Sequence, residues 1–192
     1  RPHLMGVINL SPDSWYRESV ILNTDAALVR ARRLRAEGAD LVDLGAESSL
    51  HHAARVDPAQ QIATLLPILK PLAQEGSLIS IETYQPVVAR RCLEAGAAVL
   101  NLTGTRPHDD LYKAVADHKA GIILCYVQGE HVRAVGDFVH SPDHATALLD
   151  YFRREIDRAV HAGVHAIWID PGLGFYYKNL QDSTARIRYQ AE

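Results

Sequence analysis

The stretch TDAALVRARRLRAEGADLVDLGAES, residues 24–48, decides how we expect this chain to fold. Its first part, residues 24–39, opens on Thr24 as a candidate N-cap and ends near Gly38, and these residues are signals for the two ends of a helix. Its second part, residues 40–48, is an apolar run typical of a buried strand. A helix that leads directly into a buried strand is part of a repeated βα pattern, so the stretch favours an α/β protein.

The same alternation continues on both sides of this stretch. We expect further strands in the apolar segments 3–10, 77–84, 97–104, 120–129 and 165–170. We expect further helices at 57–76, 85–96, near 109–118, at 141–163 with Ser141 as a candidate cap, and near 180–190. Near-continuous apolar strands separated by helices predict a parallel sheet, either open and doubly wound or closed as a (β/α)8 barrel. An open dinucleotide-binding sheet should carry G-x-G-x-x-G after its first strand, and that motif is absent here.

Composition argues against several classes of protein. The chain has 192 residues, which suits one domain, and its net charge of -3 without a block of basic residues argues against nucleic acid or an acidic membrane surface as partner. No apolar run is long enough to span a bilayer, so we expect a cytoplasmic protein. Cys92 and Cys125 both lie in apolar segments, so we expect two buried thiols rather than a disulfide or a zinc site.

Each of the six predicted strands carries polar groups near its carboxyl end. They are Asn9, Asp43 to Glu47, Glu82, Asn101, Tyr126 with Gln128, and Asp170. An unpaired carboxylate in the core of a barrel would cost on the order of several kcal/mol. The carboxyl ends of barrel strands instead meet at one pocket. We therefore interpret these groups as a ligand site.

Each polar residue also has a purely structural interpretation. Asn9 could cap the loop that follows it, and Asp43 could accept a backbone N–H inside the core. Glu82 could pair with Arg90 or Arg91. These alternatives explain single residues but not the repetition of polar groups at six strand ends.

The same holds further along the chain. Asn101 and Asp170 could each cap the turn that follows it. The adjacent His51 and His52 are more typical of a solvated loop than of a metal site. The acidic segment 107–110 is more typical of a helix start.

Three hydrogen-bond acceptors among these groups suit a planar heterocycle. A carboxylate such as Glu82 or Asp170 can accept two parallel hydrogen bonds from a ring N–H and an adjacent amino group, and Asn101 adds a carboxamide. The chain shows neither a Ser-His-Asp pattern nor a nucleotide-binding loop. The edge of a pterin ring offers the donors that these acceptors need.

Four motifs carry a family likeness. They are MGVINLSPDSWYRES (5–19), GADLVDLGAESS (38–49), ISIETYQPVVARRCLEAGAAVLNLTG (79–104) and IWIDPGLGFYYKN (167–179). Together they resemble the pterin-binding enzyme family, and within it most closely the dihydropteroate synthases. The resemblance implies a TIM (β/α)8 barrel in which residues 1–192 form a single pterin-binding domain. Only about six βα units are present, so we expect the C-terminal units to be missing from this chain.

The resemblance also implies an activity, namely a transferase of folate biosynthesis that joins 4-aminobenzoate to a hydroxymethyl-dihydropterin diphosphate. It implies Mg²⁺ as cofactor and a homodimer. Asn9 would be catalytic and hold Mg²⁺ and the diphosphate, and Asp13, beside Ser14, would lie in a mobile catalytic loop. The residues implied to bind the pterin are Glu82, Asn101, Asp170 and Lys178. Those implied to contact substrate from the second loop are Ser48 and Ser49.

Several positions depart from the family pattern. The second loop reads Glu-Ser-Ser-Leu-His-His at 47–52, where the family usually has Glu-Ser-Thr-Arg-Pro-Gly, so its arginine is replaced by Leu50. Tyr126 replaces a histidine, Glu82 replaces an aspartate, and Lys178 comes one residue late. These departures keep other functions open: a paralogue that uses another amine, a non-catalytic pterin-binding protein, a methyltetrahydrofolate-dependent methyltransferase, or an unrelated barrel enzyme that acts on a phosphorylated metabolite.

Overall fold

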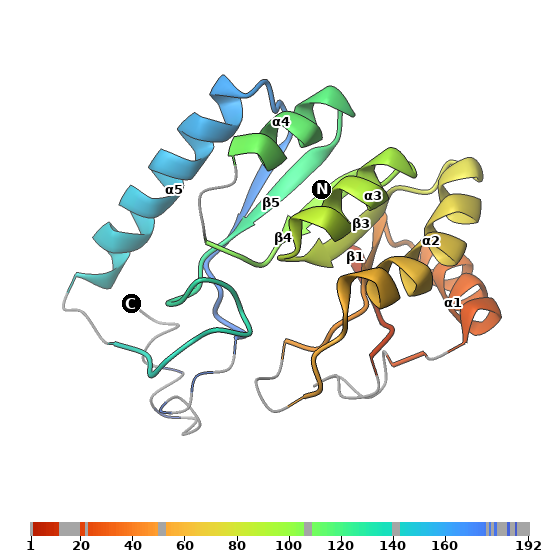
Figure 1. The fold of residues 1–192 in the computed structure, drawn as a ribbon, viewed down its shortest axis with the longest axis horizontal. Coiled ribbons are helices and arrows are strands. Elements are labelled where there is room, and N and C mark those ends of the chain that lie inside the picture. Colours follow the sequence, from red (N-terminus) through yellow and green to blue (C-terminus); the bar gives the residue numbers. More distant parts are fainter. Residues whose placement is uncertain are drawn as a thin grey trace.

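The computed structural model describes residues 2–11, 20–21, 23–49, 53–105, 109–139 and 143–175, together with Tyr177, Asn179, Thr184 and Ile187. In these ranges strands and helices alternate along the chain, as Figure 1 shows. The strands are β1 (Met5–Asn9), β2 (Leu41–Gly45), β3 (Ile79–Thr83), β4 (Val99–Leu102), β5 (Gly121–Cys125) and β6 (Ile167–Asp170). The helices are α1 (Thr24–Ala36), α2 (Pro58–Gln74), α3 (Pro86–Glu94), α4 (Asp109–Asp117) and α5 (His144–His161).

The strands form one parallel sheet in the order β1-β2-β3-β4-β5-β6. A doubly wound sheet would reverse its strand order at a switch point, whereas a (β/α)8 barrel adds each strand beside the one before it. The predicted fold class, a partial α/β barrel, is therefore confirmed, with six strands and five helices in the described part of the chain.

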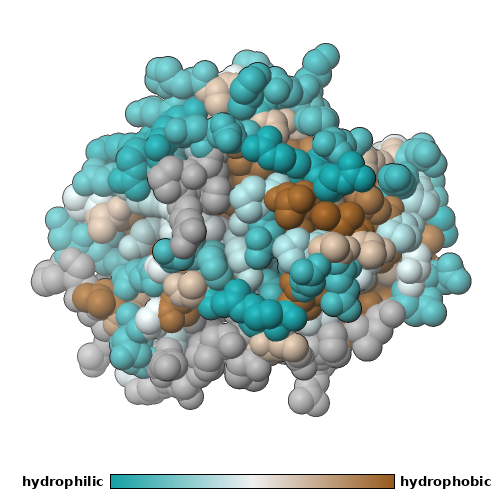
Figure 2. Space-filling model, in the orientation of Figure 1, coloured by the Kyte–Doolittle hydropathy of each residue, from teal (hydrophilic) through white to brown (hydrophobic). Residues whose placement is uncertain are grey.

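The helices cover one face of the sheet, and the hydrophobic core lies between the two layers. Outward-facing strand residues such as Ile8, Leu44 and Leu100 are buried beneath the helices. At Gly6 a Cβ atom would lie 2.9 Å from Leu34 Cδ1 of α1, so the missing side chain lets this helix pack closely on β1. The solvent side of the helical layer is mostly hydrophilic, with small apolar patches between (Figure 2).

Two helix starts differ from the sequence prediction. The N-cap of α1 is Asn23 rather than Thr24, because Asn23 Oδ1 accepts the backbone N–H groups of Asp25 and Ala26 at 2.9 and 3.2 Å. Helix α5 begins after Asp143, whose side chain caps it through the N–H of Thr146. Ser141, the predicted cap, lies outside the described residues, as does nearly all of the helix expected near 180–190.

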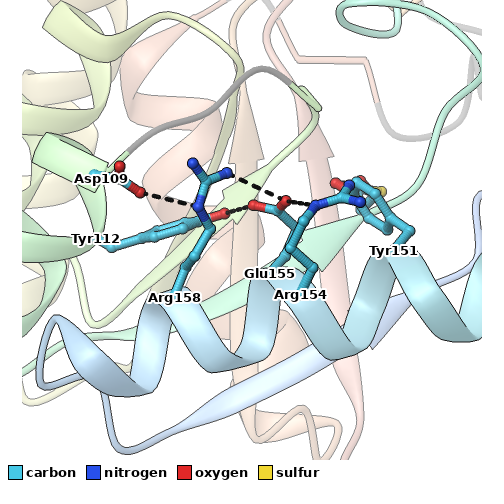
Figure 3. A network of polar contacts seen from close by, with 7 residues as sticks. Asp109, Tyr112, Tyr151, Arg154, Glu155 and Arg158 are labelled. Atoms are coloured by element: carbon cyan, nitrogen blue, oxygen red, sulfur yellow. Dashed lines mark hydrogen bonds and ion pairs between the residues drawn. The ribbon is translucent and has the colours of Figure 1, made fainter.

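A buried polar network joins α4 to α5 (Figure 3). Glu155 is only 3% exposed and accepts the Tyr112 hydroxyl at 2.9 Å and Arg154 Nε at 2.9 Å. Arg158 lies 3.5 Å from the same carboxylate and pairs with Asp109 of α4 at 3.3 Å. Both carboxylate oxygens of Glu155 accept hydrogen bonds. The network therefore stabilises the packing of α5 against α4 and leaves no unpaired charge on Glu155.

The opposite face of the sheet is covered less by the residues that the structure describes. Near its amino-terminal edge Met5, Val7 and Leu78 are 41%, 39% and 55% exposed. Trp168 is 48% exposed and its ring lies against the Cα of Gly121, where a Cβ would meet it at 2.7 Å. None of the described helices is long and apolar enough to cross a membrane.

Candidate functional site

The strand ends bring the predicted polar residues together on the face of the sheet opposite the helices. Asn9, Gly45, Glu82 and Asn101 lie side by side in register on β1 to β4. A Cβ at Gly45 would lie 2.9 Å from Glu82 Oε2 and 3.7 Å from Asn9 Oδ1, so both side chains lean over the same glycine. The sequence predicts that these groups meet where the carboxyl ends of the strands converge, which we call the mouth of the barrel, and their register is consistent with that prediction.

Two further sets of neighbouring strand residues lie before and after the set formed by Asn9, Gly45, Glu82 and Asn101. Asp43 and Ser80 pair just before that set, toward the amino-terminal edge. Cys125 and Asp170 pair at the ends of β5 and β6. The negative charges of Asp170, Glu82 and Asp43 all contribute to raising the pKa of Cys125, after burial, so the three sets share one electrostatic environment.

Glu82 is a partly neutral carboxyl group. Its Oε1 accepts the Thr103 hydroxyl at 2.6 Å. Burial raises its pKa to about 7, and the nearby charges of Asp43 and Glu47 add to the rise. Near neutral pH this side chain therefore exists both as an acceptor-only carboxylate and as an acid that can donate a proton.

The proposed pairing of Glu82 with a neighbouring arginine is wrong. Arg90 lies 3.9 Å from Asp110, and Arg91 lies 2.7 Å from Glu94. Both pairs are on the helical side of the sheet, whereas Glu82 faces the other side.

Asp43 does not have the backbone partner that the structural interpretation expected. Its Oδ2 accepts Asn101 Nδ2 at 3.2 Å, so Asn101 reaches back to Asp43 instead of capping the turn after β4. Asp43 is 5% exposed and burial raises its pKa. Within the described part of the chain Asp43 Oδ1 and the Ser80 hydroxyl lack a partner in ordinary hydrogen-bond geometry, although that hydroxyl still moderates the rise in pKa.

Asp170 has both a structural and a site-facing role. Its Oδ1 accepts the backbone N–H of Gly172 at 2.8 Å, which confirms that it caps the turn. Gly172 has φ of +75°, and a Cβ there would lie 2.1 Å from the Tyr126 carbonyl, so the turn requires glycine. The other oxygen, Oδ2, accepts the Cys125 thiol at 3.2 Å. Cys92 and Cys125 are both free and buried, as predicted.

A cluster that the sequence did not reveal ties the loop after β2 to the loop after β5. Buried Arg133 donates to the carbonyls of Ser48 and Ala53 at 3.0 and 2.6 Å. Arg55 in turn donates to the Arg133 carbonyl at 3.2 Å. We call these three contacts, with those of Tyr84 described next, the loop clamp.

Tyr84, just past the end of β3, forms the centre of the loop clamp. Its hydroxyl donates to Glu47 Oε2 at 2.6 Å and accepts Arg55 Nη1 at 2.8 Å. Its ring stacks on His131 with centroids 3.9 Å apart and planes within 1°. Glu47 Oε1 accepts the N–H of Val56, which closes the loop on itself.

Some of the remaining predicted positions are described by the structure, and others lie outside the described residues. Ser48 is buried under the loop clamp and Ser49 is half-buried beside it. Gln128 bonds the N–H and the carbonyl of Val139 and so holds a loop together. Asp13, Ser14, Leu50, His51, His52 and Lys178 lie outside the described residues.

We next consider which of the described side chains could bind a metal ion. Within the ranges that the structure describes, no group of three or more His, Cys, Asp or Glu side chains is arranged to hold an ion. Asn9, the predicted metal residue, does place its carboxamide oxygen at the mouth beside Glu82. A carboxamide oxygen is a ligand type that Mg²⁺ accepts.

Comparison with known proteins gives consistent results along the chain. The family model described as Pterin binding enzyme matches residues 5–189. The dihydropteroate synthase type-3 of Escherichia coli is 30% identical over 176 residues, which cover 90% of this chain and 66% of the relative. This chain thus spans just under two thirds of that relative's length.

Solved structures agree with the sequence matches. A Xanthomonas albilineans dihydropteroate synthase with 4-aminobenzoic acid superposes with a TM-score of 0.78 at 28% identity, over 100% of this chain and 67% of that one. A Burkholderia cenocepacia dihydropteroate synthase complexed with 7,8-dihydropteroate gives 0.79 at 32% identity, over 96% of this chain and 63% of that one.

Proposed function

The chain belongs to the pterin binding enzyme family, and from that premise we propose that it acts as a transferase of the dihydropteroate synthase type in folate biosynthesis. Its substrates would be a hydroxymethyl-dihydropterin diphosphate and 4-aminobenzoate or another aryl amine. Support comes from similar structures that hold 4-aminobenzoic acid and 7,8-dihydropteroate. The proposal includes a single barrel domain that works as a cytoplasmic homodimer.

The observation that carries the proposal is the fixed carboxylate of Asp170 in one mouth with Glu82 and Asn101. A carboxylate held in a defined plane can accept the ring N–H and the amino group of a pterin in parallel. Glu82, with its pKa near 7, can accept from or donate to another ring position.

In the proposed reaction the bond between the pterin methylene carbon and the diphosphate oxygen breaks, and diphosphate leaves with the bonding electrons. The amine nitrogen forms the new C–N bond and loses a proton. The acidic side chains at this mouth would stabilise positive charge that develops on the pterin and its methylene. Holding the pterin by Asp170 and Asn101 would orient the methylene toward the amine.

Mg²⁺ belongs to the proposal through Asn9. The carboxamide oxygen of Asn9 leans over Gly45 at the mouth, and oxygen ligands shared with substrate phosphates are the usual environment of Mg²⁺. When bound, the ion would neutralise charge on the leaving diphosphate. Asp13 and Lys178 are proposed substrate contacts on the resemblance alone.

One observation favours a variation of the second substrate. The family's second-loop arginine is replaced by Leu50, and Arg133 from the loop after β5 donates to the carbonyls of Ser48 and Ala53, on either side of that position. The amine side of the site would then differ from that of the usual synthase, which suits another aryl amine than 4-aminobenzoate.

The proposal is tested by calorimetric titration of the full-length protein with hydroxymethyl-dihydropterin diphosphate, with and without Mg²⁺. Losing a charged hydrogen-bond partner should weaken binding by about 10-fold or more in Glu82→Ala and Asp170→Ala. Glu94→Ala is the matched control, because Glu94 is an exposed glutamate paired with Arg91 on α3. Turnover is then measured with 4-aminobenzoate and with aryl amines that lack the carboxylate. An intact protein that binds no pterin would overturn the proposal.

A further inference from the structure

We propose that Cys125 is a positioning residue that orients Asp170 for the pterin, an inference that rests on the proposed function. The thiol lies 3.2 Å from Asp170 Oδ2, while the N–H of Gly172 lies 2.8 Å from Oδ1. Two donors on different oxygens fix the rotation of the carboxylate about its χ2 bond. Without the thiol, the described residues would anchor one oxygen instead of two.

The contact is built into the fold. Cys125 and Asp170 are register partners at the ends of β5 and β6, and the N–H of Tyr126 donates to the Asp170 carbonyl at 2.8 Å. The Cys125 carbonyl accepts the Tyr151 hydroxyl of α5 at 3.0 Å. Because hydrogen bonds hold the backbones of both residues, the sheet places the short Cys125 side chain directly beside the Asp170 carboxylate.

The arrangement leaves hydrogen-bond acceptor positions for a ligand. A carboxylate offers about four acceptor positions, and the residues that the structure describes fill one on each oxygen of Asp170. One position therefore stays available on each oxygen, as a bidentate contact with two parallel N–H groups requires. A thiol is a weak donor, so Asp170 keeps more of its strength as an acceptor than it would beside an arginine.

The thiol is suited to donating and poorly suited to covalent chemistry. Cys125 is 1% exposed, and burial, followed by the charges of Asp170, Glu82 and Asp43, raises its pKa well above the ordinary value. It therefore keeps its proton through the physiological range, and a protonated buried thiol is neither a nucleophile nor readily oxidised.

The functional test compares pterin binding by Cys125→Ala and Cys125→Ser in the full-length protein. Both variants lose the sulfur volume, but only serine keeps a donor, so packing and hydrogen bonding are separated. We expect pterin affinity to fall about 5- to 20-fold in Cys125→Ala. In Cys125→Ser at least half of the lost binding free energy should be recovered. The KM of the amine should stay within about 2-fold of wild type, which general loosening of the fold would not allow. Cys92→Ala, at the other buried cysteine, is the matched control.

A spectroscopic measurement tests the contact even if the alanine variant folds poorly. In a protein whose other cysteines are replaced by alanine, beginning with Cys92, the infrared S–H stretching band reports the hydrogen bond of Cys125 directly. We expect a band lowered in frequency by the carboxylate acceptor and shifted upward in Asp170→Asn, because a carboxamide oxygen is a weaker acceptor.

The outcomes separate this inference from the proposed function. If wild type binds no pterin, the proposed function fails. If wild type binds pterin, but Cys125→Ala binds equally well or serine gives no recovery, the function stands and the positioning role of Cys125 is refuted. An S–H band that does not respond to Asp170→Asn also refutes it.

Discussion

Glu82 shows how burial changes the chemistry of a carboxyl group. Its carboxyl group lies against Gly45, bonds Thr103 and is surrounded by other acids, and burial raises its pKa to about 7. The family position normally carries aspartate, whose shorter side chain would not extend as far over the glycine. The sequence showed the exchange, but not the shift in pKa, because the shift depends on burial beside Asp43 and Glu47.

This pKa makes stability depend on pH in a defined direction. Between about 4.5, the ordinary value, and about 7, the folded state holds a proton on Glu82 that the unfolded state has lost. The free energy of unfolding should therefore fall as pH rises through this window, by about 2–3 kcal/mol in total. Glu82→Gln should remove this fall while keeping an acceptor for Thr103. The measurement is denaturant unfolding at pH 5 and pH 8.

Glu94→Gln is the control for that comparison, because Glu94 is exposed and paired with Arg91. Its pH dependence should match that of wild type within about 0.5 kcal/mol. If Glu82→Gln also keeps the wild-type slope, Glu82 ionises normally and its account here is wrong.

Among the elements, the strands and helices were predictable and the loop clamp was not. Local patterns in the sequence indicated every described strand and helix, with bounds that were mostly too wide, because hydrophobic runs continue past the last ladder bond. The N-caps Asn23 and Asp143 were missed by one and two residues, since a neighbouring Thr or Ser fits the same pattern. Arg133 bonds residues 80 and 85 positions away, and nothing near it in sequence indicates those partners.

The loop clamp predicts a specific loss on removing its buried arginine. Arg133→Met would remove the guanidinium that donates to the carbonyls of Ser48 and Ala53, so we expect the free energy of unfolding to fall by about 2–3 kcal/mol. Amide hydrogen exchange should speed up at residues 47–49 and 53–56, because their loop loses its anchor.

Arg91→Met serves as the matched substitution on an exposed helix. It removes only a surface ion pair with Glu94, and we expect a change below about 0.5 kcal/mol with no effect on exchange in the second loop. Equal exchange rates in Arg133→Met and wild type would show that the loop is held by other contacts.

For the whole molecule, repeated βα units made the strand order predictable. The sequence also indicated that the strand ends form the site, because parallel strands all point their carboxyl ends the same way. What it could not show is how unequally the two faces of the sheet are covered. The helical face carries the core, while Val7, Leu78 and Trp168 on the other face remain accessible.

This difference between faces gives a test with two leucines. Leu100 on β4 is 1% exposed beneath the helices, and Leu78, just before β3 on the other face, is 55% exposed. In this chain Leu100→Ala should lower the free energy of unfolding by about 2–5 kcal/mol, and Leu78→Ala by less than about 1 kcal/mol. Chemical denaturation of both variants measures the two losses. Similar losses would mean that a second layer buries Leu78.

Gly45 ties the position of the Glu82 carboxylate to the size of its neighbour across the sheet. Any side chain at position 45 would come within 2.9 Å of Glu82 Oε2, so alanine there would push the carboxylate away from β2 and strain its bond to Thr103. Because the nearest atom is the end of a flexible side chain, the carboxylate can move aside, but it would then leave its place over β2 and its contact with Thr103. A side chain at position 45 would therefore change the site through Glu82 before it changed the packing of the sheet.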